Sequence, residues 1–138
     1  MTPYMTVYDN FLGKIRDYKF LSVINNDQEL AKNILLNHLR SAIASYTYSD
    51  KFEDRDDEKE VFNFSLSSVE IEILAKFMIV DYLTPYLISS NNLENTFSSR
   101  ELQNFSPANL IKSILDIRTK EQEEAIELMV EEYYRGRA

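Results

Sequence analysis

The sequence contains no cysteine and no tryptophan, and it has only two glycines and three prolines among its 138 residues. The absence of cysteine excludes disulfides and cysteine-based metal or catalytic sites. The scarcity of glycine and proline argues against β-sandwiches and barrels, which need turn residues every few positions. The first residues also lack the pattern of a signal peptide, so we expect none. These absences favour a mainly helical protein.

Positive charge is also in short supply, with 15 Lys and Arg against 23 Asp and Glu and a formal net charge of -8. Because phosphate binding depends on clustered Lys and Arg, this balance argues against a surface that coats DNA or an anionic membrane. An acidic surface would instead let DNA slide past without adhesion. No run reaches the roughly 20 uninterrupted apolar residues that span a bilayer, so we expect no membrane contact.

The apolar content of the chain is sufficient for a genuine core, because hydrophobic residues make up 44% of the sequence. A chain of this length suits one domain rather than two. We therefore expect a single helical domain over residues 1–138. Its predicted fold is a helical bundle with a long C-terminal helix and one short strand or β-hairpin.

The most apolar stretch, residues 67–89, is predicted to be a central helix around which the others pack. Ser67 and Glu70 have the spacing of a capping box, which marks the start of a helix. The helix is apolar nearly all round, so it must be covered on most sides. Glu72 and Lys76 have the favourable i,i+4 spacing of an exposed ion pair. We expect Glu70, Glu72, Lys76 and Asp81, the polar exceptions of this stretch, to mark its outer edge.

Two earlier helices are predicted from helical spacing of apolar residues. The first runs to about Asp17 and is expected to begin at Thr2 and Pro3, because proline suits the first helical position. The second spans about 27–46, with Asn26 as a possible cap. Its apolar stripe covers one face only. This second helix is expected to be half exposed.

The C-terminal part of the chain predicts one long helix. Pro85 should first bend or thin the central helix near residues 81–84. Ser106 and Pro107 then form a clear start signal, and the segment 107–134 contains no further glycine or proline. Its ends are apolar and its middle, 118–124, is polar. Such a helix either bridges two surfaces or turns its polar middle to solvent on a compact bundle.

Residues 50–60 contain seven acids and three bases, which is typical of a solvated or disordered loop. Asp54 and Asp56 have calcium-loop spacing, but the turn glycine is missing and the closing position is Ser65, so the segment does not fit an EF-hand. Residues 61–66 follow with the two-residue period of a strand. A strand needs a partner, which is either residues 46–48 or the equivalent strand of a neighbouring subunit.

Catalytic patterns are not found in the sequence. The only histidine, His38, lies beside an apolar helical stripe, where a hydrogen-bonded boundary residue is the more common role. There is no nucleophile elbow, phosphate loop or paired-histidine helix. The carboxylates lie in solvated runs rather than in apolar pockets that would raise a pKa. We expect no enzyme activity, no cofactor and no metal site.

Aromatic residues are abundant and most fall on predicted core positions. Those near element ends and on the strand are interface candidates, because aromatic side chains are enriched at the centres of protein interfaces. A basic tail over 135–138 is expected to be flexible, and either docks on a partner or phosphate, or frays at the helix end. The interface candidates are Tyr46, Tyr48, Phe52, Phe62, Phe64, Tyr133, Tyr134, Arg135 and Arg137.

The order of these elements resembles a known family. The run SLSSVEIEILAKFMIVDYL, followed by NFSPANLIKSILDIRTKEQEEAIELMVEEYYRG, is similar to small neck proteins of tailed bacteriophages, the head-to-tail connector or adaptor class. The resemblance covers roughly residues 8–136. It implies a virion protein, made in the host cytoplasm, that forms a homo-oligomeric ring, commonly of twelve copies. Such a ring docks on the portal, contacts tail or neck proteins and extends the DNA channel.

The resemblance also implies roles for two groups of residues. The C-terminal segment 133–137 would contact the portal. Acids in the charged loop and in the middle of the long helix would line the channel and reduce DNA adhesion. The candidate channel acids are Asp54, Asp56, Asp57, Glu58, Glu121, Glu123 and Glu124. The alternative hypothesis is a small acidic phage protein that binds and inhibits a host enzyme.

Overall fold

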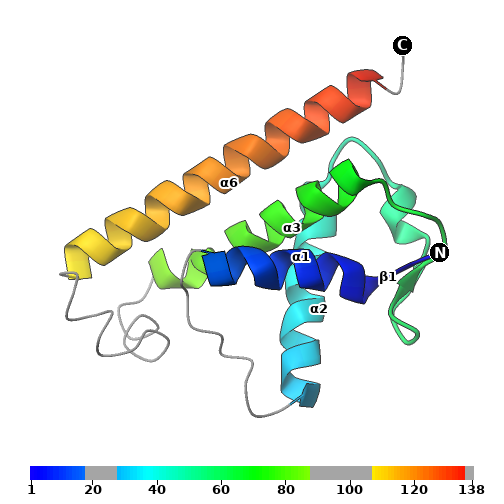
Figure 1. The fold of residues 1–138 in the computed structure, drawn as a ribbon, viewed down its shortest axis with the longest axis horizontal. Helices are drawn as coiled ribbons and strands as arrows, with labels where there is room; N and C mark the ends of the chain where they lie inside the picture. Colours follow the sequence, from blue (N-terminus) through cyan, green and yellow to red (C-terminus); the bar gives the residue numbers. More distant parts are fainter. Residues whose placement is uncertain (18–27, 88–106, 136–138) are drawn as a thin grey trace.

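The computed structural model describes residues 1–17, 28–87 and 107–135, and within these ranges the fold is mostly helical. The helix α3 lies at the centre and contacts α1, α2 and α6 (Figure 1). The long helix α6 runs along one side of the molecule, and a small sheet lies at the end of α1 near the N-terminus. The predicted fold class, with its long C-terminal helix and short β element, is confirmed.

The elements follow one another in chain order. They are β1 (Thr2–Pro3), α1 (Tyr4–Asp17), α2 (Gln28–Ser45), the 3-10 helix η1 (Lys51–Glu53), β2 (Arg55–Asp56), β3 (Val61–Phe62), α3 (Ser68–Leu83), the 3-10 helix η2 (Thr84–Leu87) and α6 (Pro107–Arg135). The proposed cap Asn26 and the proposed cap Ser106 lie outside the described residues.

The central helix α3 begins as the sequence predicts. The Ser67 Oγ accepts a hydrogen bond from the Glu70 backbone N–H, and Glu70 Oε1 accepts one from the Ser67 backbone N–H. This reciprocal pair satisfies two backbone donors that would otherwise lack partners. Behind the cap, the residues Ile73–Ile79 are all buried. The helix is therefore surrounded on most sides.

The end of α3 also agrees with the sequence. The α-helix stops at Leu83 and continues as the tighter helix η2, which contains Pro85. Proline removes a backbone donor and clashes with the preceding turn, so a regular α-helix does not continue through it. The Thr84 Oγ1 donates to the Val80 carbonyl oxygen at 2.7 Å.

Glu70 and Lys76 differ from their predicted role as exposed markers of the outer edge. Glu70 is 5% exposed because it belongs to the capping box, and Lys76 is the second case. It is only 7% exposed and faces α6, where its Nζ lies 3.1 Å from Glu121 Oε2 and 2.6 Å from Glu124 Oε2. Glu72 is a more distant partner at 3.7 Å. The prediction was wrong because helical spacing pairs only neighbours on the same helix, whereas stronger partners come from another helix.

Glu72 in turn connects α3 to the first helix. Asn10 Nδ2 donates to Glu72 Oε2 at 3.0 Å, and Lys14 forms an ion pair with Glu72. Burial alone would raise the pKa of Glu72, but these hydrogen bonds outweigh burial and hold the pKa below its usual value. The ion cluster formed by Lys14, Glu72, Lys76, Glu121 and Glu124 thus joins α1, α3 and α6.

The polar middle of α6 is packed against α3, so neither predicted role describes it fully. Glu121 is 2% exposed and binds Lys76, while Glu123 faces solvent. Apolar contacts flank the ion cluster on the same helix, since Ile114, Ala125 and Met129 are buried. The helix therefore lies against the bundle through its middle as well as through its ends.

The small sheet has the strand order β1-β3-β2, and both pairings are antiparallel. Phe62 is paired with Thr2 on one side and with Arg55 on the other. The strand predicted over 61–66 covers only Val61–Phe62, and its partners lie within the chain but are not the predicted segment 46–48. Thr2 and Pro3 were expected to start a helix. They form a strand instead, because pairing with a distant segment prevails over a local start signal.

The acidic segment 50–60 is structured rather than a disordered loop. It contains η1 and β2, and the Asp56 Oδ1 accepts hydrogen bonds from the backbone N–H groups of Glu58 and Lys59. Glu60 adopts a left-handed backbone conformation with a φ of 56°, which is uncommon for a residue with a side chain. Its carbonyl oxygen accepts from the Tyr4 N–H at 2.8 Å.

Within the described ranges, none of the helices has both the length and the apolar character needed to cross a membrane.

Candidate functional site

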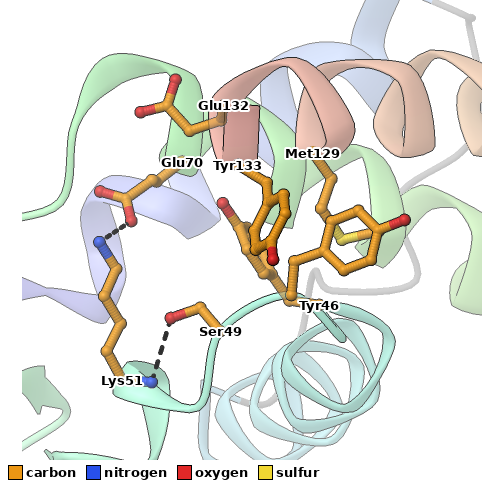
Figure 2. Close-up of a pocket in the computed structure, with 8 residues that line it drawn as sticks. Tyr46, Ser49, Lys51, Glu70, Met129, Glu132 and Tyr133 are labelled. Carbon is orange, nitrogen blue, oxygen red and sulfur yellow. Dashed lines mark hydrogen bonds and ion pairs between the residues drawn. The ribbon is translucent and has the colours of Figure 1, made fainter. Parts of the chain in front are cut away.

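A groove of about 270 Å³ opens where the end of α2, the start of α3 and the end of α6 meet (Figure 2). Three of its walls are tyrosine rings, and two glutamates and one lysine provide its charges. We call it the tyrosine groove. It is lined by Tyr46, Tyr48, Ser49, Lys51, Glu70, Met129, Glu132 and Tyr133.

The end of α2 positions the first wall of the tyrosine groove. The Tyr46 N–H donates to the carbonyl oxygens of Ala42 and Ile43, both at 3.1 Å, which closes the last turn of the helix. The chain then turns through Ser49, whose Oγ accepts from the Lys51 N–H at 3.3 Å. This turn brings the Lys51 side chain to the groove, where it points toward Glu70 (Figure 2).

The capping box of α3 positions the acidic wall. Because the Ser67 N–H holds one oxygen of Glu70, the other oxygen faces Lys51 and forms an ion pair with it. The Glu70 side chain is 6% exposed and that of Lys51 is 46% exposed. The Lys51 ammonium also lies 5.6 Å from the Phe52 ring centroid and 5.4 Å from that of Phe64. A buried carboxylate is thus satisfied by a half-exposed cation.

The last turns of α6 supply the opposite wall. Met129, Glu132 and Tyr133 have i, i+3 and i+4 spacing, which puts them on one face of the helix. The Tyr133 ring packs on Tyr48 with a centroid distance of 4.9 Å, and on Tyr134 at 5.4 Å. Tyr48 is 46% exposed and Tyr134 is 66% exposed. The rim of the groove is therefore aromatic and open to solvent.

Burial and the two carboxylates of the groove both act on the Tyr46 hydroxyl. Burial raises the pKa of Tyr46 to about 12, with further contributions from the negative charges of Glu70 and Glu132. Glu132 lies 3.7 Å from the Arg135 guanidinium, whose side chain is 69% exposed. The groove therefore combines aromatic surfaces with two carboxylates and a single lining cation.

The structure brings together several predicted interface candidates and separates others. Tyr46, Tyr48 and Tyr133 line the groove, and Tyr134 and Arg135 lie at the end of the same helix. Arg135 belongs to α6 and not to a flexible tail, whereas Arg137 and the rest of 136–138 lie outside the described residues.

Three of the interface candidates are buried within the protomer. Phe62 is 0%, Phe52 is 1% and Tyr46 is 5% exposed. Their rings pack on one another, with centroid distances of 4.6 Å for Tyr46 and Phe52 and 5.9 Å for Phe52 and Phe62. Phe52 and Phe62 therefore do not present a surface to a partner. Phe64 is half-buried and packs against Phe52 at 5.7 Å.

The candidate channel acids do not form one surface. Asp54, Glu58 and Glu123 are exposed and Asp56 is half-buried. Asp57 accepts hydrogen bonds from Tyr4 and Arg40, at 2.5 Å and 2.9 Å. Glu121 and Glu124 bind Lys76. The buried Glu121 and the bonded Asp57 hold the fold together, so they are poor candidates for a channel lining.

The structure places His38 at a boundary position, as the sequence predicts. Its Nδ1 lies 2.7 Å from Asp81 Oδ2, and its ring lies 6.0 Å from Phe11 and 5.9 Å from Tyr82 by centroid. Among the described residues, no group of three or more His, Asp or Glu is arranged to hold a metal ion.

Sequence reasoning missed five residues of the tyrosine groove, namely Ser49, Lys51, Glu70, Met129 and Glu132. Glu70 was recognised only as a capping residue. The spacing of Met129, Glu132 and Tyr133 does contain a usable signal, because it places a carboxylate beside an interface candidate. The contribution of Lys51 carries no comparable signal, since it depends on how a distant loop meets α3.

Comparison with protein-family models, with curated proteins and with solved structures gave no match to this chain.

Proposed function

We propose that the protein is a non-catalytic structural subunit of a bacteriophage neck, forming a homo-oligomeric ring that docks on the portal and extends the DNA channel. The proposal starts from the resemblance of residues 8–136 to head-to-tail connector proteins. The observation that carries it is the exposed aromatic rim at the end of α6. Exposed tyrosines beside a groove are typical of protein interfaces rather than of a free surface.

The position of this rim supports a contact with another protein. Tyr134 is 66% exposed and packs on Tyr133, which itself packs on Tyr48 from a different segment. The rim is therefore held by the fold and is not a loose end. Tyrosine carries large contact area with little conformational entropy to lose, which suits an interface.

The outer face of α6 supports a place beside DNA. Asp116, Glu123 and Glu127 are exposed and line one shallow hollow together with Leu115 and Lys120. A surface of predominantly negative charge repels the phosphate backbone. In the proposed ring this face lines the channel, and the described acids of residues 50–60 lie at another part of the surface.

The same acidic face favours a second candidate function. A helix with Asp116, Glu123 and Glu127 exposed resembles the charge of a nucleic-acid backbone, so a small inhibitor that occupies a host enzyme would also present it. Capture of a host nuclease or polymerase in a pull-down, with no association with virus particles, would favour this candidate over the neck.

The test of the neck proposal is binding to a portal ring. The protein and the portal protein of the same phage are mixed and examined by light scattering and electron microscopy. We expect a ring of protein density on the portal and the presence of the protein in purified virions. A strict monomer that leaves the portal unbound at high concentration, and that is missing from virions, would overturn the proposal.

A matched pair of variants locates the contact. Tyr134→Ala removes an exposed ring at the rim, and Leu115→Ala removes an exposed apolar side chain of 47% exposure elsewhere on α6. We expect Tyr134→Ala to weaken portal binding by about tenfold, as truncation of an interface tyrosine does. Leu115→Ala should have little effect. Equal effects of the two variants would contradict the proposed role of the rim.

A further inference from the structure

The tyrosine groove has the composition of a site for a cation. Its walls include the rings of Tyr46, Tyr48 and Tyr133. The face of an aromatic ring carries partial negative charge and attracts ammonium and guanidinium groups. The volume of about 270 Å³ is small compared with typical ligand pockets, which measure roughly 300–1,000 Å³. It therefore suits one side chain rather than a larger molecule.

The two carboxylates of the groove differ in how far they are already satisfied. Glu70 accepts from the Ser67 N–H at 2.8 Å and forms an ion pair with Lys51, so both of its oxygens are engaged. Glu132 lies 3.7 Å from Arg135, a distance beyond that of a good hydrogen bond. Arg135 is also 69% exposed. Glu132 is consequently the carboxylate that an incoming cation would meet.

The molecule already binds one of its own cations in a similar way next to the groove. The Lys51 ammonium lies over the Phe52 and Phe64 rings and pairs with Glu70. The combination of ring faces with one carboxylate therefore occurs once within the chain. Tyr48, Tyr133 and Glu132 supply a second set of ring faces and a carboxylate in the lining of the groove, and the Tyr48 and Tyr133 rings pack on each other.

We infer that the tyrosine groove binds an arginine side chain of a partner protein, which stacks on the Tyr48 and Tyr133 rings and pairs with Glu132. Arginine is the fitting cation because its planar guanidinium stacks on aromatic rings and pairs with a carboxylate through two parallel hydrogen bonds. This inference rests on the proposed function only in treating the end of α6 as a contact with another protein.

The test uses the full chain, labelled with ¹⁵N, and the peptide acetyl-Gly-Arg-Gly-amide. Peptides with lysine and with citrulline in place of arginine are the comparisons, since citrulline keeps the shape and loses the charge. We expect saturable shifts of backbone signals around Tyr48, Lys51 and Tyr133 with the arginine peptide. Weaker shifts should follow with lysine and none with citrulline. Equal binding of the citrulline peptide, or shifts centred elsewhere, would overturn the inference.

Two variants of neighbouring acids sharpen the test. Glu132→Gln removes the carboxylate of the groove, and Glu131→Gln removes the same charge from an exposed position one residue earlier that does not line it. We expect Glu132→Gln to weaken the arginine peptide by about tenfold, the loss of one charge-assisted hydrogen bond. Glu131→Gln should leave the affinity within about twofold. Equal losses would mean that general negative charge, and not the groove, attracts the peptide.

The outcomes distinguish this inference from the neck proposal. If the protein binds arginine specifically but forms no ring and does not bind the portal, the arginine site is supported and the neck proposal is rejected. If the protein forms a ring on the portal but does not bind the arginine peptide, the neck proposal is supported and the arginine site is rejected. A peptide corresponding to residues 134–138 tests separately whether the arginine comes from a second copy of the chain.

Discussion

Two lysine–glutamate sites in this protein use the same chemistry in opposite ways. Lys76 is closed between α3 and α6, with a side chain 9% exposed and with Glu121 and Glu124 as its nearest carboxylates. Lys51 stands at an open groove, with a side chain 46% exposed and Glu70 as its partner. The first site joins helices, whereas the second leaves ring faces and a second carboxylate accessible. Accessibility, and not the type of residue, separates the structural site from the candidate binding site.

The largest effect is expected from Lys76→Met. This change keeps much of the side-chain volume but removes the Lys76 ammonium from Glu121, which is 2% exposed. Removing one partner of a buried ion pair costs about 3–5 kcal/mol. The free energy of unfolding, measured by urea denaturation, should fall by about that amount. Lys112→Met at an exposed position of α6 is the control, and an equal loss there would contradict a special role for Lys76.

The second largest effect is expected from acid, which should weaken the ion cluster around Lys76. Hydrogen bonds from Lys76 lower the pKa of Glu124, and hydrogen bonds from Lys14 and Asn10 outweigh burial and lower that of Glu72. Because these folded-state pKa values lie below the unfolded value of about 4.5, their stabilisation is fully present above pH 4.5. It is lost as the pH falls through the lowered values. Urea denaturation between pH 7 and pH 3 should show the decline.

The variant Glu72→Gln tests how much of this acid sensitivity comes from the Glu72 carboxylate. It should lower stability at pH 7 and reduce the further loss between pH 4.5 and pH 3, because one of the lowered groups is gone. Glu123→Gln at an exposed position should change neither quantity appreciably. An unchanged pH dependence in Glu72→Gln would show that Glu72 does not contribute to the decline.

Ser67→Ala tests the connection between the helix cap and the groove. It removes the acceptor of the Glu70 N–H, and loss of an N-cap side chain typically costs about 1 kcal/mol. Thermal unfolding should report this loss, with Ser68→Ala as the exposed control. We expect the affinity for the arginine peptide to stay within about twofold, because the Ser67 backbone N–H still holds the Glu70 carboxylate and the arginine pairs with Glu132. A larger loss of affinity would contradict this separation of the cap from the groove.

The smallest effect is expected from Lys51→Met at the open site. Glu70 keeps its hydrogen bond from the Ser67 N–H, and the Lys51 end of the pair is half exposed. Because solvent screens a pair whose cation is 46% exposed, the free energy of unfolding should fall by no more than about 1 kcal/mol in urea denaturation. A loss as large as that of Lys76→Met would erase the distinction between the two sites.

The sequence predicts the helices well because their signals are local. The capping box at Ser67 and Glu70, the proline at position 85 and the uninterrupted run after Pro107 all act within a few residues. The errors arise where distant segments compete with such signals. Thr2 and Pro3 look like a helix start but pair with Val61 and Phe62.

The candidate site was predicted only in part for the same reason. The aromatic residues Tyr46, Tyr48 and Tyr133 stand out by composition, so they were identified as interface candidates. The charges that give the groove its character come from α3 and from the turn after α2, and no spacing along the chain connects them. Glu70 and Lys51 became visible only once the three segments were brought together.

The ion cluster also connects α1 with α6 through α3. Lys14 on α1 holds Glu72, Glu72 shares Lys76 with α6, and Lys76 holds Glu121 and Glu124. A change in α1 therefore affects α6 through the charged side chains of α3. Replacing Lys14 should speed amide hydrogen exchange in the central turns of α6. Lys14 and the α6 residue Glu121 nevertheless lie more than 100 positions apart in the sequence.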